Sequence, residues 1–219
     1  YVPKFYDVEY NDDNTISRFE PNREGVPKQV RKRIILNMDN TYVPKKLIVP
    51  FMETVHDRIM LELFRGCIRG CRFCQAGYIY RPVRERSVDK LVETAGECIK
   101  NTGYEEMSMS SLSTSDYTDL DELTNKLLDI TVDKRINLSL PSLRVDNFSM
   151  ELMEKVQKVK KSGLTFAPEA GTQRLRDVIN KNVLESDLIR TSNIAFRGGY
   201  NRIKLYFMLG LPTETVSYT

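Results

Sequence analysis

Three of the four cysteines in the sequence lie within eight residues, in the stretch LFRGCIRGCRFCQAGYIYRPVRERS from Leu63 to Ser87. Cys67, Cys71 and Cys74 form a CxxxCxxC pattern that is interleaved with glycines and arginines. Thiolates are the usual ligands of iron-sulfur clusters, and glycine lets a loop wrap so that three of them turn inward. Three protein ligands would leave one iron of a 4Fe-4S cluster open to a substrate or cofactor, as in catalytic metal sites.

Other uses of these thiols do not match a count of three. Structural zinc takes four ligands, so it would need Cys98 or His56 to complete the site. Cys98 lies on the apolar face of a predicted helix, where a free cysteine behaves as a small hydrophobe. His56, the only histidine, precedes the first predicted strand and is predicted to be structural or solvent-facing. A disulfide would leave one thiol over. A cluster is favoured, with a non-catalytic iron-sulfur or zinc module as the alternative.

The elements that must position the cysteines begin at about Asp57, where short apolar runs alternate with amphipathic stretches. Strands are predicted at 58–64, 106–111, 136–141, 163–168 and 202–209. This alternation is typical of parallel βαβ units. Apolar residues at helical spacing predict helices between the strands: Val88, Leu91, Val92, Ala95, Cys98 and Ile99 in the first, Leu120, Leu123 and Leu127 in the second, and Phe148, Leu152, Val156 and Val159 in the third.

Capping residues agree with these helices. Thr118 with Asp121 is predicted to form a capping box, and Gly198 with Gly199 is predicted to end a helix over 184–196. Further N-caps are predicted at Ser149, Thr172 and Ser186.

Residues 1–55 differ from the rest, since they are rich in proline, asparagine and charge and lack helical periodicity. We expect an extended lead-in that packs against the main body, with extended segments at 32–38 and 45–51, and a core domain over 56–219. The chain opens without methionine, so we expect it to be a piece of a longer protein.

Composition is that of a globular protein, with 41% hydrophobic residues and a formal charge of +3. This small charge neither demands nor excludes a nucleic-acid partner, and the runs RKR and KVKK are read as solvated faces. No apolar run reaches membrane-spanning length and no signal peptide opens the chain. A cytoplasmic protein without a membrane partner is expected.

Polar and glycine-rich clusters follow every predicted strand: the cysteines, then SLSTSD, PSLR, PEAGTQR and GLPTET. Five parallel β/α units could form an open doubly wound sheet or a barrel. Because β/α barrels carry ligands and catalysis on the rim where strands end, the clusters favour a partial barrel with one shared site.

The CxxxCxxC pattern, with Phe73 before its last cysteine and on the loop after the first strand, resembles the radical S-adenosylmethionine superfamily. CRFCQAGYIYRPVRERS and GLPTET are similar to the branch that contains radical methylthiotransferases and cobalamin-binding radical enzymes. YVPKFYDVEY resembles the segment after the cobalamin-binding domain in one family of unknown function in that branch. The motifs shared with the radical superfamily cover Asp57 to Thr219. The resemblance to the cobalamin-linked family covers only the first dozen residues. The resemblance implies an α/β fold, a partial (β/α) barrel truncated after about five units.

The resemblance also implies the cofactors and partners. Cys67, Cys71 and Cys74 would hold a 4Fe-4S cluster that reductively cleaves S-adenosylmethionine to methionine and a 5'-deoxyadenosyl radical. A reductant such as flavodoxin or ferredoxin would supply electrons, and an upstream domain would bind cobalamin. The implied reaction is methylation or a related modification of an RNA, protein or small molecule. A methylthiotransferase is the alternative, although it normally needs a second cluster, whose cysteines are missing here.

The resemblance places ligand contacts at the strand ends. Phe73 would lie against adenine. Polar residues after the second and third strands would contact the amino group, ribose or carboxylate: Ser111, Ser113, Asp116, Ser142 and Arg144. For Asp116, capping of the next helix is the alternative.

The last two strands add further candidates. Glu169 would accept from ribose hydroxyls and Arg174 would clamp a carboxylate, with a ligand-free salt bridge between the two as the alternative. Met208, Leu209 and Gly210 would line adenine. The arginines after the cysteines are read equally as contacts for an acidic substrate or cofactor phosphate and as solubilising residues: Arg81, Arg84 and Arg86.

Overall fold

The computed structural model describes residues 1–146, 149–156 and 163–215 of the chain. Two compact units are present, Tyr1–Leu36 and Asn37–Thr219. Within the described ranges, every helix is too short or too polar to cross a membrane. The predicted domain boundary after residue 55 stays a prediction.

The first unit is a β-hairpin. A 3-10 helix, η1 (Pro3–Phe5), leads into β1 (Tyr6–Tyr10), which pairs antiparallel with β2 (Ile16–Pro21). The Tyr6 ring stacks on Phe19 with centroids 4.6 Å apart, and its hydroxyl donates to the Pro27 carbonyl at 2.9 Å. This hairpin was not predicted, although YDVEY alternates apolar and acidic residues and NDDNT is a turn sequence. The extended segments predicted at 32–38 and 45–51 form no strand.

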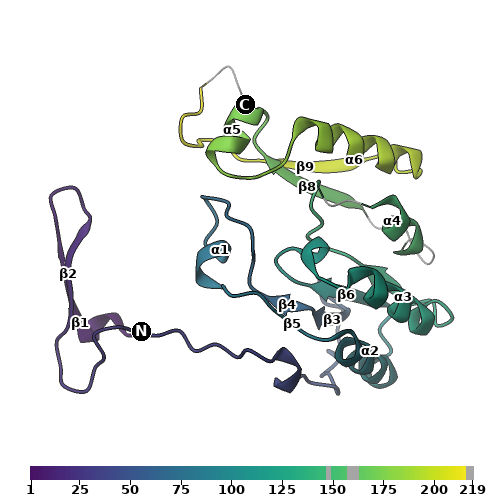
Figure 1. Ribbon diagram of the computed structural model, residues 1–219. Coiled ribbons are helices and arrows are strands. Elements are labelled where there is room, and N and C mark those ends of the chain that lie inside the picture. Colours follow the sequence, from purple (N-terminus) through teal and green to yellow (C-terminus); the bar gives the residue numbers. More distant parts are fainter. Residues whose placement is uncertain (147–148, 157–162, 216–219) are drawn as a thin grey trace. The chain divides into compact units, whose positions relative to one another are not determined.

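The second unit contains five parallel strands in two sheets (Figure 1). The first sheet has the order β3-β6-β7, and β8 pairs with β9 in the second. An antiparallel pair, β4 with β5, closes the base of the cysteine loop. The strands are β3 (Ile59–Glu62), β4 (Phe64–Arg65), β5 (Arg84–Glu85), β6 (Glu106–Ser110), β7 (Asn137–Ser139), β8 (Leu164–Glu169) and β9 (Ile203–Phe207).

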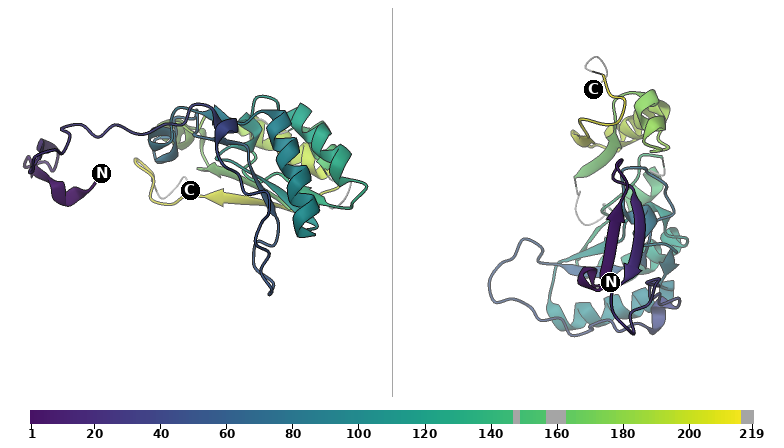
Figure 2. Two further views of the ribbon diagram at one scale, coloured as in Figure 1. Left: turned by 90° about the horizontal axis from the view of Figure 1, so that it is seen from below. Right: turned by 90° about the vertical axis from the view of Figure 1, so that its left-hand side faces the viewer.

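Helices lie between these strands along the chain, because two parallel neighbours need a crossover connection that returns the chain to the same end of the sheet. Two of them, α2 and α3, lie side by side (Figure 2). The α/β class and the five parallel strands are therefore confirmed, with the strands in two sheets. The remaining elements are η2 (Met38–Asn40), α1 (Ala76–Ile79), α2 (Val88–Thr102), η3 (Thr114–Asp116), α3 (Leu120–Thr131), α4 (Met150–Val156), α5 (Gln173–Val178) and α6 (Glu185–Arg197).

The helix ends follow the predicted chemistry in part. The Thr172 hydroxyl accepts from the Leu175 N–H at 3.3 Å, so this N-cap is confirmed. The Ser149 hydroxyl accepts similarly from Leu152 at 3.4 Å. Gly198 is the C-cap of α6 as predicted, with Gly199 at φ 82°. Phe148 and Val159, predicted on the apolar face of α4, lie outside the described residues.

Two predicted N-caps are wrong. Helix α3 starts after Asp119, so the Thr118 capping box is absent. Helix α6 starts at Glu185, one residue before the predicted cap Ser186. The start of α6 is stabilised instead by the Asp187 carboxylate, which accepts from the Leu184 N–H at 3.0 Å. An acidic side chain in the first turn thus stabilises the start of α6, whereas Asp119, the N-cap of α3, makes no capping hydrogen bond with its side chain.

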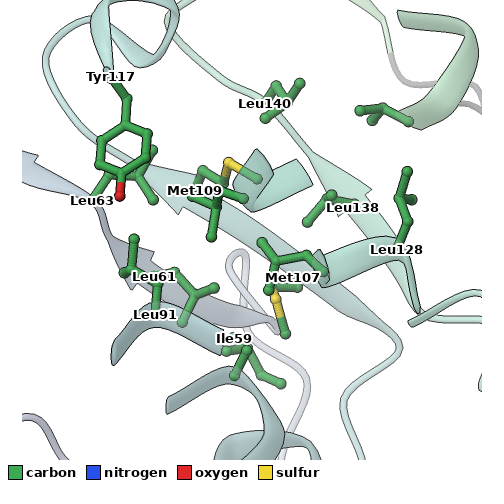
Figure 3. Close-up of a cluster of buried hydrophobic side chains, with 14 of the residues drawn as sticks. Ile59, Leu61, Leu63, Leu91, Met107, Met109, Tyr117, Leu128, Leu138 and Leu140 are labelled. Carbon is green, nitrogen blue, oxygen red and sulfur yellow. The ribbon is translucent and has the colours of Figure 1, made fainter. Parts of the chain in front are cut away.

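The core lies between the first sheet and its helices (Figure 3). In β3, Ile59 and Leu61 are buried, whereas Met60 between them is 52% exposed. This alternation means that one face of the sheet packs on helices and the other stays open. Apolar side chains from β6, β7, α2 and α3 complete the core: Met107, Met109, Leu138, Leu91, Leu123 and Leu127.

Alanine at Leu61 is expected to lower the free energy of unfolding by about 3 kcal/mol, because it removes a fully buried side chain and leaves a cavity. Alanine at the adjacent Met60 should change it by less than about 1 kcal/mol, since that side chain faces the open side. Urea denaturation of both variants checks this. Equal losses would contradict the orientation of β3.

The segment after Leu36 packs on this core. Met38 is fully buried, and its carbonyl accepts from the Arg86 guanidinium at 2.7 Å. Leu47 packs against the apolar core. The Cys98 thiol faces the Pro44 carbonyl at 3.9 Å. Residues 37–47 are therefore part of the scaffold that supports the strands.

Candidate functional site

The three clustered cysteines lie on the loop between β4 and β5, at the carboxyl end of the first parallel strand. All three thiols are free; Cys71 is 9% exposed and the other two are partly exposed. The Cys74 N–H donates to the Cys71 carbonyl at 3.1 Å, which makes a tight turn between these two ligand positions. The loop therefore presents thiols from a compact backbone.

Two glycines are required by this compact path. Gly66 has φ +103°, and a Cβ there would lie 2.6 Å from the Tyr80 carbonyl oxygen. A Cβ on Gly77, in α1, would lie 2.4 Å from the Arg69 carbonyl oxygen. Both contacts are with backbone atoms, so neither can be relieved by a side-chain rotation. The glycines let the loop fold back on itself.

Alanine at Gly77 is expected to displace the cysteine loop and destabilise the fold by about 1–3 kcal/mol, because its Cβ overlaps backbone. Gly96 is the matched control, since it lies inside α2 and a Cβ added there would meet nothing within 4 Å. Alanine at Gly96 should stabilise by roughly 0.5–1 kcal/mol through helix propensity. Thermal unfolding measures both, and a neutral Gly77 variant would argue against the close approach.

Two of the three arginines after the cysteines hold the loop together. Arg81 donates to the carbonyls of Cys67 at 3.3 Å and of Ile68 at 2.9 Å. Arg84 donates to the carbonyls of Pro82 at 2.9 Å and of Tyr80 at 3.3 Å. Neither sequence-based reading described this use of the guanidinium groups.

Arg86 is also internal to the protein, being only 4% exposed. It donates to the Glu62 carbonyl at 3.1 Å and to the Glu62 carboxylate at 3.0 Å. A solubilising role is wrong for this residue, because its charge is buried and paired.

A chain of ion pairs joins the cysteine loop to the ends of β6 and β7. Arg69 donates to the Asp116 carboxylate through two nitrogens, and its Nη1 lies 3.5 Å from Asp146. Asp146 also accepts from Arg144 at 2.9 and 3.1 Å. The Arg144 guanidinium then reaches the Lys181 carbonyl at 3.2 Å. Charged groups from three segments and a backbone carbonyl from a fourth thus meet at the rim.

The ion pairs at the rim keep the Asp116 carboxylate ionised. Burial is the largest single influence and opposes ionisation, but hydrogen bonding together with the positive charges of Arg69 and Arg144 outweighs it, so the pKa of Asp116 lies below its usual value. Asp116 does not cap α3, whose N-cap is Asp119. The helix-capping alternative is therefore wrong for Asp116.

Two of the predicted serines, Ser111 and Ser113, lie on the same segment as Asp116, between β6 and α3. Ser111 Oγ is 3.0 Å from Thr114 Oγ1, which donates to the Pro141 carbonyl at 2.6 Å. The Ser113 hydroxyl is buried beside Asp116 and has no partner that meets hydrogen-bond geometry among the described residues. The Ser111 and Thr114 hydroxyls link the ends of β6 and β7.

The end of β8 carries a second polar group. Glu169 has φ +68°, and its carboxylate pairs with Lys181 at 3.0 Å. Lys181 Nζ also lies 5.9 Å from the centroid of the Phe73 ring, which is 39% exposed. The predicted adenine wall and the predicted ribose acceptor therefore face the same ammonium group.

The alternative to ligand binding, a salt bridge between Glu169 and Arg174, is wrong. Arg174 instead donates to the Thr213 hydroxyl at 3.0 Å and to the Thr213 carbonyl at 2.9 Å. Arg174 thereby ties α5 to the segment that follows β9.

The remaining predicted residues lie farther along the strand ends. Ser142 is exposed at φ +61° after β7. The Met208 N–H donates to the Glu169 carbonyl at 2.7 Å, so the end of β9 adjoins the end of β8. Leu209 is 77% exposed and Gly210 has φ +78°.

A hollow of about 510 Å³ opens beside the cysteine loop over β3 and β6. Its charged wall is the pair of Glu62 with Arg65, at 2.6 and 3.0 Å. Hydrogen bonding from Arg65 and then from Arg86 keeps the pKa of Glu62 below its usual value. Apolar and hydroxyl side chains line the rest: Phe64, Tyr80, Ser110, Ser111 and Leu112.

Three of the charged residues at this rim were missed by sequence reasoning: Arg69, Asp146 and Lys181. Arg69 lies inside the cysteine pattern, and Asp146 shortly follows a predicted strand. Their positions were a weak signal, because arginine and aspartate are common in exposed loops.

The two residues that could have completed a zinc site are elsewhere. Cys98 is 3% exposed on α2, and burial raises the pKa of its thiol. His56 is exposed before β3, as predicted. Across the described ranges, no three or more histidine, cysteine or acidic side chains lie close enough together to hold one metal ion. The cysteines of a cubane cluster bind different irons, so a cluster does not require them to converge on one point.

Comparison with known proteins identifies the family. Residues 61–218 match the model of the Radical SAM superfamily. The uncharacterised protein MJ0966 of Methanocaldococcus jannaschii is 41% identical over 181 residues, which cover 78% of this chain and 39% of that protein. A candidate methylthiotransferase of the same organism, MJ0865, is 25% identical over 90% of this chain and 46% of its own length. The chain thus spans less than half of these relatives.

Solved structures with the same fold include two proteins with cobalamin bound. The radical S-adenosylmethionine methyltransferase TsrM from Kitasatospora setae, with cobalamin and a 4Fe-4S cluster bound, has a TM-score of 0.58 at 13% identity over 72% of this chain and 32% of that chain. The radical enzyme OxsB, with aqua-cobalamin bound, has a TM-score of 0.53 at 14% identity over 68% of this chain and 23% of that chain. These similarities concern the parallel α/β fold. Because the family match covers both the cysteine loop and the strand ends around it, the chain belongs to the radical S-adenosylmethionine superfamily.

Proposed function

We propose that this chain is the catalytic core of an enzyme that binds a 4Fe-4S cluster and S-adenosylmethionine. The observation that carries the proposal is the arrangement of Cys67, Cys71 and Cys74. They are three free thiols on a glycine-built loop at the carboxyl end of the first parallel strand, with the fourth cysteine buried elsewhere.

The residues present fit such a cluster. Thiolates are its ordinary ligands, and three of them leave one iron open for a small molecule. The Gly66 and Gly77 contacts keep the loop backbone compact, since a side chain at either position would collide with carbonyl oxygens. When bound and reduced, the cluster would supply the electron that cleaves the carbon-sulfur bond of S-adenosylmethionine.

The protein's own part would be to bind and orient S-adenosylmethionine. Phe73 offers an apolar face for adenine, and Glu169 offers acceptors for ribose hydroxyls. The Lys181 ammonium group lies beside both, so it could exchange Glu169 for the ligand carboxylate. Asp116 and the neighbouring serines offer acceptors for the amino group.

Arg144 and Arg174 are committed to internal partners in the ligand-free protein. A direct contact of either with S-adenosylmethionine would require those partners to be released. We therefore propose Lys181 ahead of Arg174 as the carboxylate contact.

The test is an anaerobic assay of the full-length protein after reconstitution with iron and sulfide. Dithionite and S-adenosylmethionine are added, and 5'-deoxyadenosine is measured by liquid chromatography. Accumulation of 5'-deoxyadenosine supports the proposal. A cluster-loaded protein that makes no 5'-deoxyadenosine, and whose spectrum does not change when S-adenosylmethionine is added, would overturn it.

For the net reaction, we propose methyl transfer or a related modification assisted by cobalamin bound outside this chain. The similarity to TsrM and OxsB supports this proposal through the fold. The substrate class is RNA, protein or a small molecule, and flavodoxin or ferredoxin is the proposed reductant. A cytoplasmic location is proposed with them.

A methylthiotransferase is the second candidate, favoured by the similarity to MJ0865. Iron analysis of the full-length protein separates the two candidates, since one cluster gives roughly four irons per chain and two clusters roughly eight. Retention of cobalamin after gel filtration would favour methyl transfer. Eight irons without retained cobalamin would favour the second candidate.

A further inference from the structure

We propose that the turn between α5 and α6, residues 179–182, positions the cysteine loop against the end of β8, and that Asn180 is its principal positioning residue. The catalytic consequence rests on the proposed function. The positioning itself concerns the protein without a cluster and can be tested there.

Four groups on this turn and the end of α5 bind the cysteine loop directly. Asn180 Nδ2 donates to the Gly70 carbonyl at 2.8 Å, a contact between residues 110 positions apart. The Arg72 N–H donates to the Ile179 carbonyl at 2.9 Å. The Arg72 side chain donates to the carbonyls of Val178 and, at 3.3 Å, of Asp177. Gly70 and Arg72 flank Cys71, so these bonds lie on either side of a proposed ligand.

The local backbone is suited to this contact. Asn180 has φ +54°, a left-handed conformation that asparagine tolerates better than most residues. A Cβ on Gly70 would lie 2.9 Å from the Asn180 amide nitrogen. The amide can therefore approach the loop backbone closely because residue 70 is glycine.

A buried arginine fixes the same turn to β8. Arg176 is 2% exposed. Its guanidinium donates to the Val183 carbonyl at 2.8 Å and to the Ala170 carbonyl at 2.9 Å. The Arg176 carbonyl accepts from the Lys181 N–H at 2.8 Å. The turn is thus anchored on the segment that directly follows Glu169.

The consequence is a short path between two parts of the proposed site. Lys181, between the two left-handed asparagines Asn180 and Asn182, directs its ammonium group to Glu169. Asn180 holds the loop that carries Phe73 and the thiols. One turn therefore determines where the thiols lie relative to the ligand groups at the end of β8.

The first test measures alkylation of cysteine thiols by iodoacetamide in the cluster-free full-length protein, followed by mass spectrometry. Asn180→Asp keeps the size and the left-handed tolerance but removes the donor, and Asn180→Gly keeps the backbone conformation alone. We expect both to raise the alkylation rate of Cys71 about tenfold, the ratio that corresponds to one lost hydrogen bond. The rate at buried Cys98 should not change, which reports that the fold is intact.

Asn182 supplies the matched control. It has φ +50° and is exposed, and its side chain makes no hydrogen bond to the cysteine loop as far as the structure describes the chain. Asn182→Asp and Asn182→Gly should leave the Cys71 rate unchanged. A wild-type Cys71 rate in Asn180→Gly, or equal increases in the Asn180 and Asn182 variants, would overturn the proposal.

A second measurement addresses the cluster. After reconstitution, we expect the Asn180 variants to shift the electron paramagnetic resonance spectrum of the reduced cluster, with iron content near that of the wild type. Wild-type spectra in both Asn180 variants would overturn the positioning of the cluster. If even the wild-type protein binds no cluster, the proposed function fails, while the alkylation rates still decide whether Asn180 holds the loop.

Discussion

Serine at Cys67, Cys71 or Cys74 is expected to abolish cluster binding and to reduce 5'-deoxyadenosine formation to background. Each thiol would bind a different iron, and a hydroxyl is a poor replacement for a thiolate on iron. Absorbance near the sulfur-to-iron charge-transfer bands, iron content and 5'-deoxyadenosine should therefore be lost together. The three variants should behave alike, because the loop offers no substitute thiol.

Cys98→Ala is the control for this loss. Cys98 is buried on α2, away from the cysteine loop in sequence and packed in the apolar core. The variant should keep its cluster, with a modest loss of stability from the smaller side chain. Loss of the cluster in Cys98→Ala, with full retention in any one of the three serine variants, would show that the ligand assignment is wrong.

The second large effect is expected at the pair of Arg69 with Asp116. Asparagine at Asp116 leaves the Arg69 guanidinium without its main partner, and breaking a buried pair is costly. We expect a loss of about 3 kcal/mol in the free energy of unfolding, at the low end for such pairs because the Arg69 side chain keeps 24% exposure. Asp146 at 3.5 Å from Arg69 compensates only in part.

The same pair predicts a pH dependence. The pKa of Asp116 is lower in the folded protein than in the unfolded chain, where it is about 3.9. Its contribution to stability is therefore fully present above about pH 4 and is lost as the pH falls through the folded-state pKa. Urea denaturation between pH 7 and pH 3 should show the difference between wild type and Asp116→Asn shrinking below about pH 4.

A double-mutant cycle separates the pair from its surroundings. Arg69→Met combined with Asp116→Asn should be more stable than the sum of the two single losses predicts, because neither charge is then left alone. Additive losses, or a difference that is constant with pH, would mean that the two side chains do not interact in solution.

Much of the fold could be predicted because it depends on local patterns. The five parallel strands follow from apolar runs, and α2 follows from apolar residues at helical spacing such as Leu91 and Ala95. The Thr172 cap and the Gly198 helix end are likewise local. The hairpin over 6–21 could also have been predicted, because YDVEY alternates apolar and acidic residues. It was missed because the proline- and asparagine-rich composition of residues 1–55 was given more weight than this two-residue period.

The errors lie where several residues compete for one role. Ser186 and Thr118 are good N-caps by type, but Asp187 bonds to the N-cap of α6 and Asp119 stands at the N-cap position of α3. Arg81 and Arg84 are exposed arginines by type, yet their donors are aimed at carbonyls of their own loop. Residue type states what a side chain can bind, whereas the choice among partners depends on distance.

The chemistry of the cysteine loop could be predicted from the sequence alone. Three thiols at fixed spacing with intervening glycines restrict the possible ligands, whichever residues surround the loop in the fold. The contacts that hold this loop could not be predicted. Arg69 meets Asp116 across 47 positions and Gly70 meets Asn180 across 110. Such pairs form because parallel strands bring the loops at their carboxyl ends to one rim, and no periodicity in the chain encodes which loop residues then come within hydrogen-bond distance.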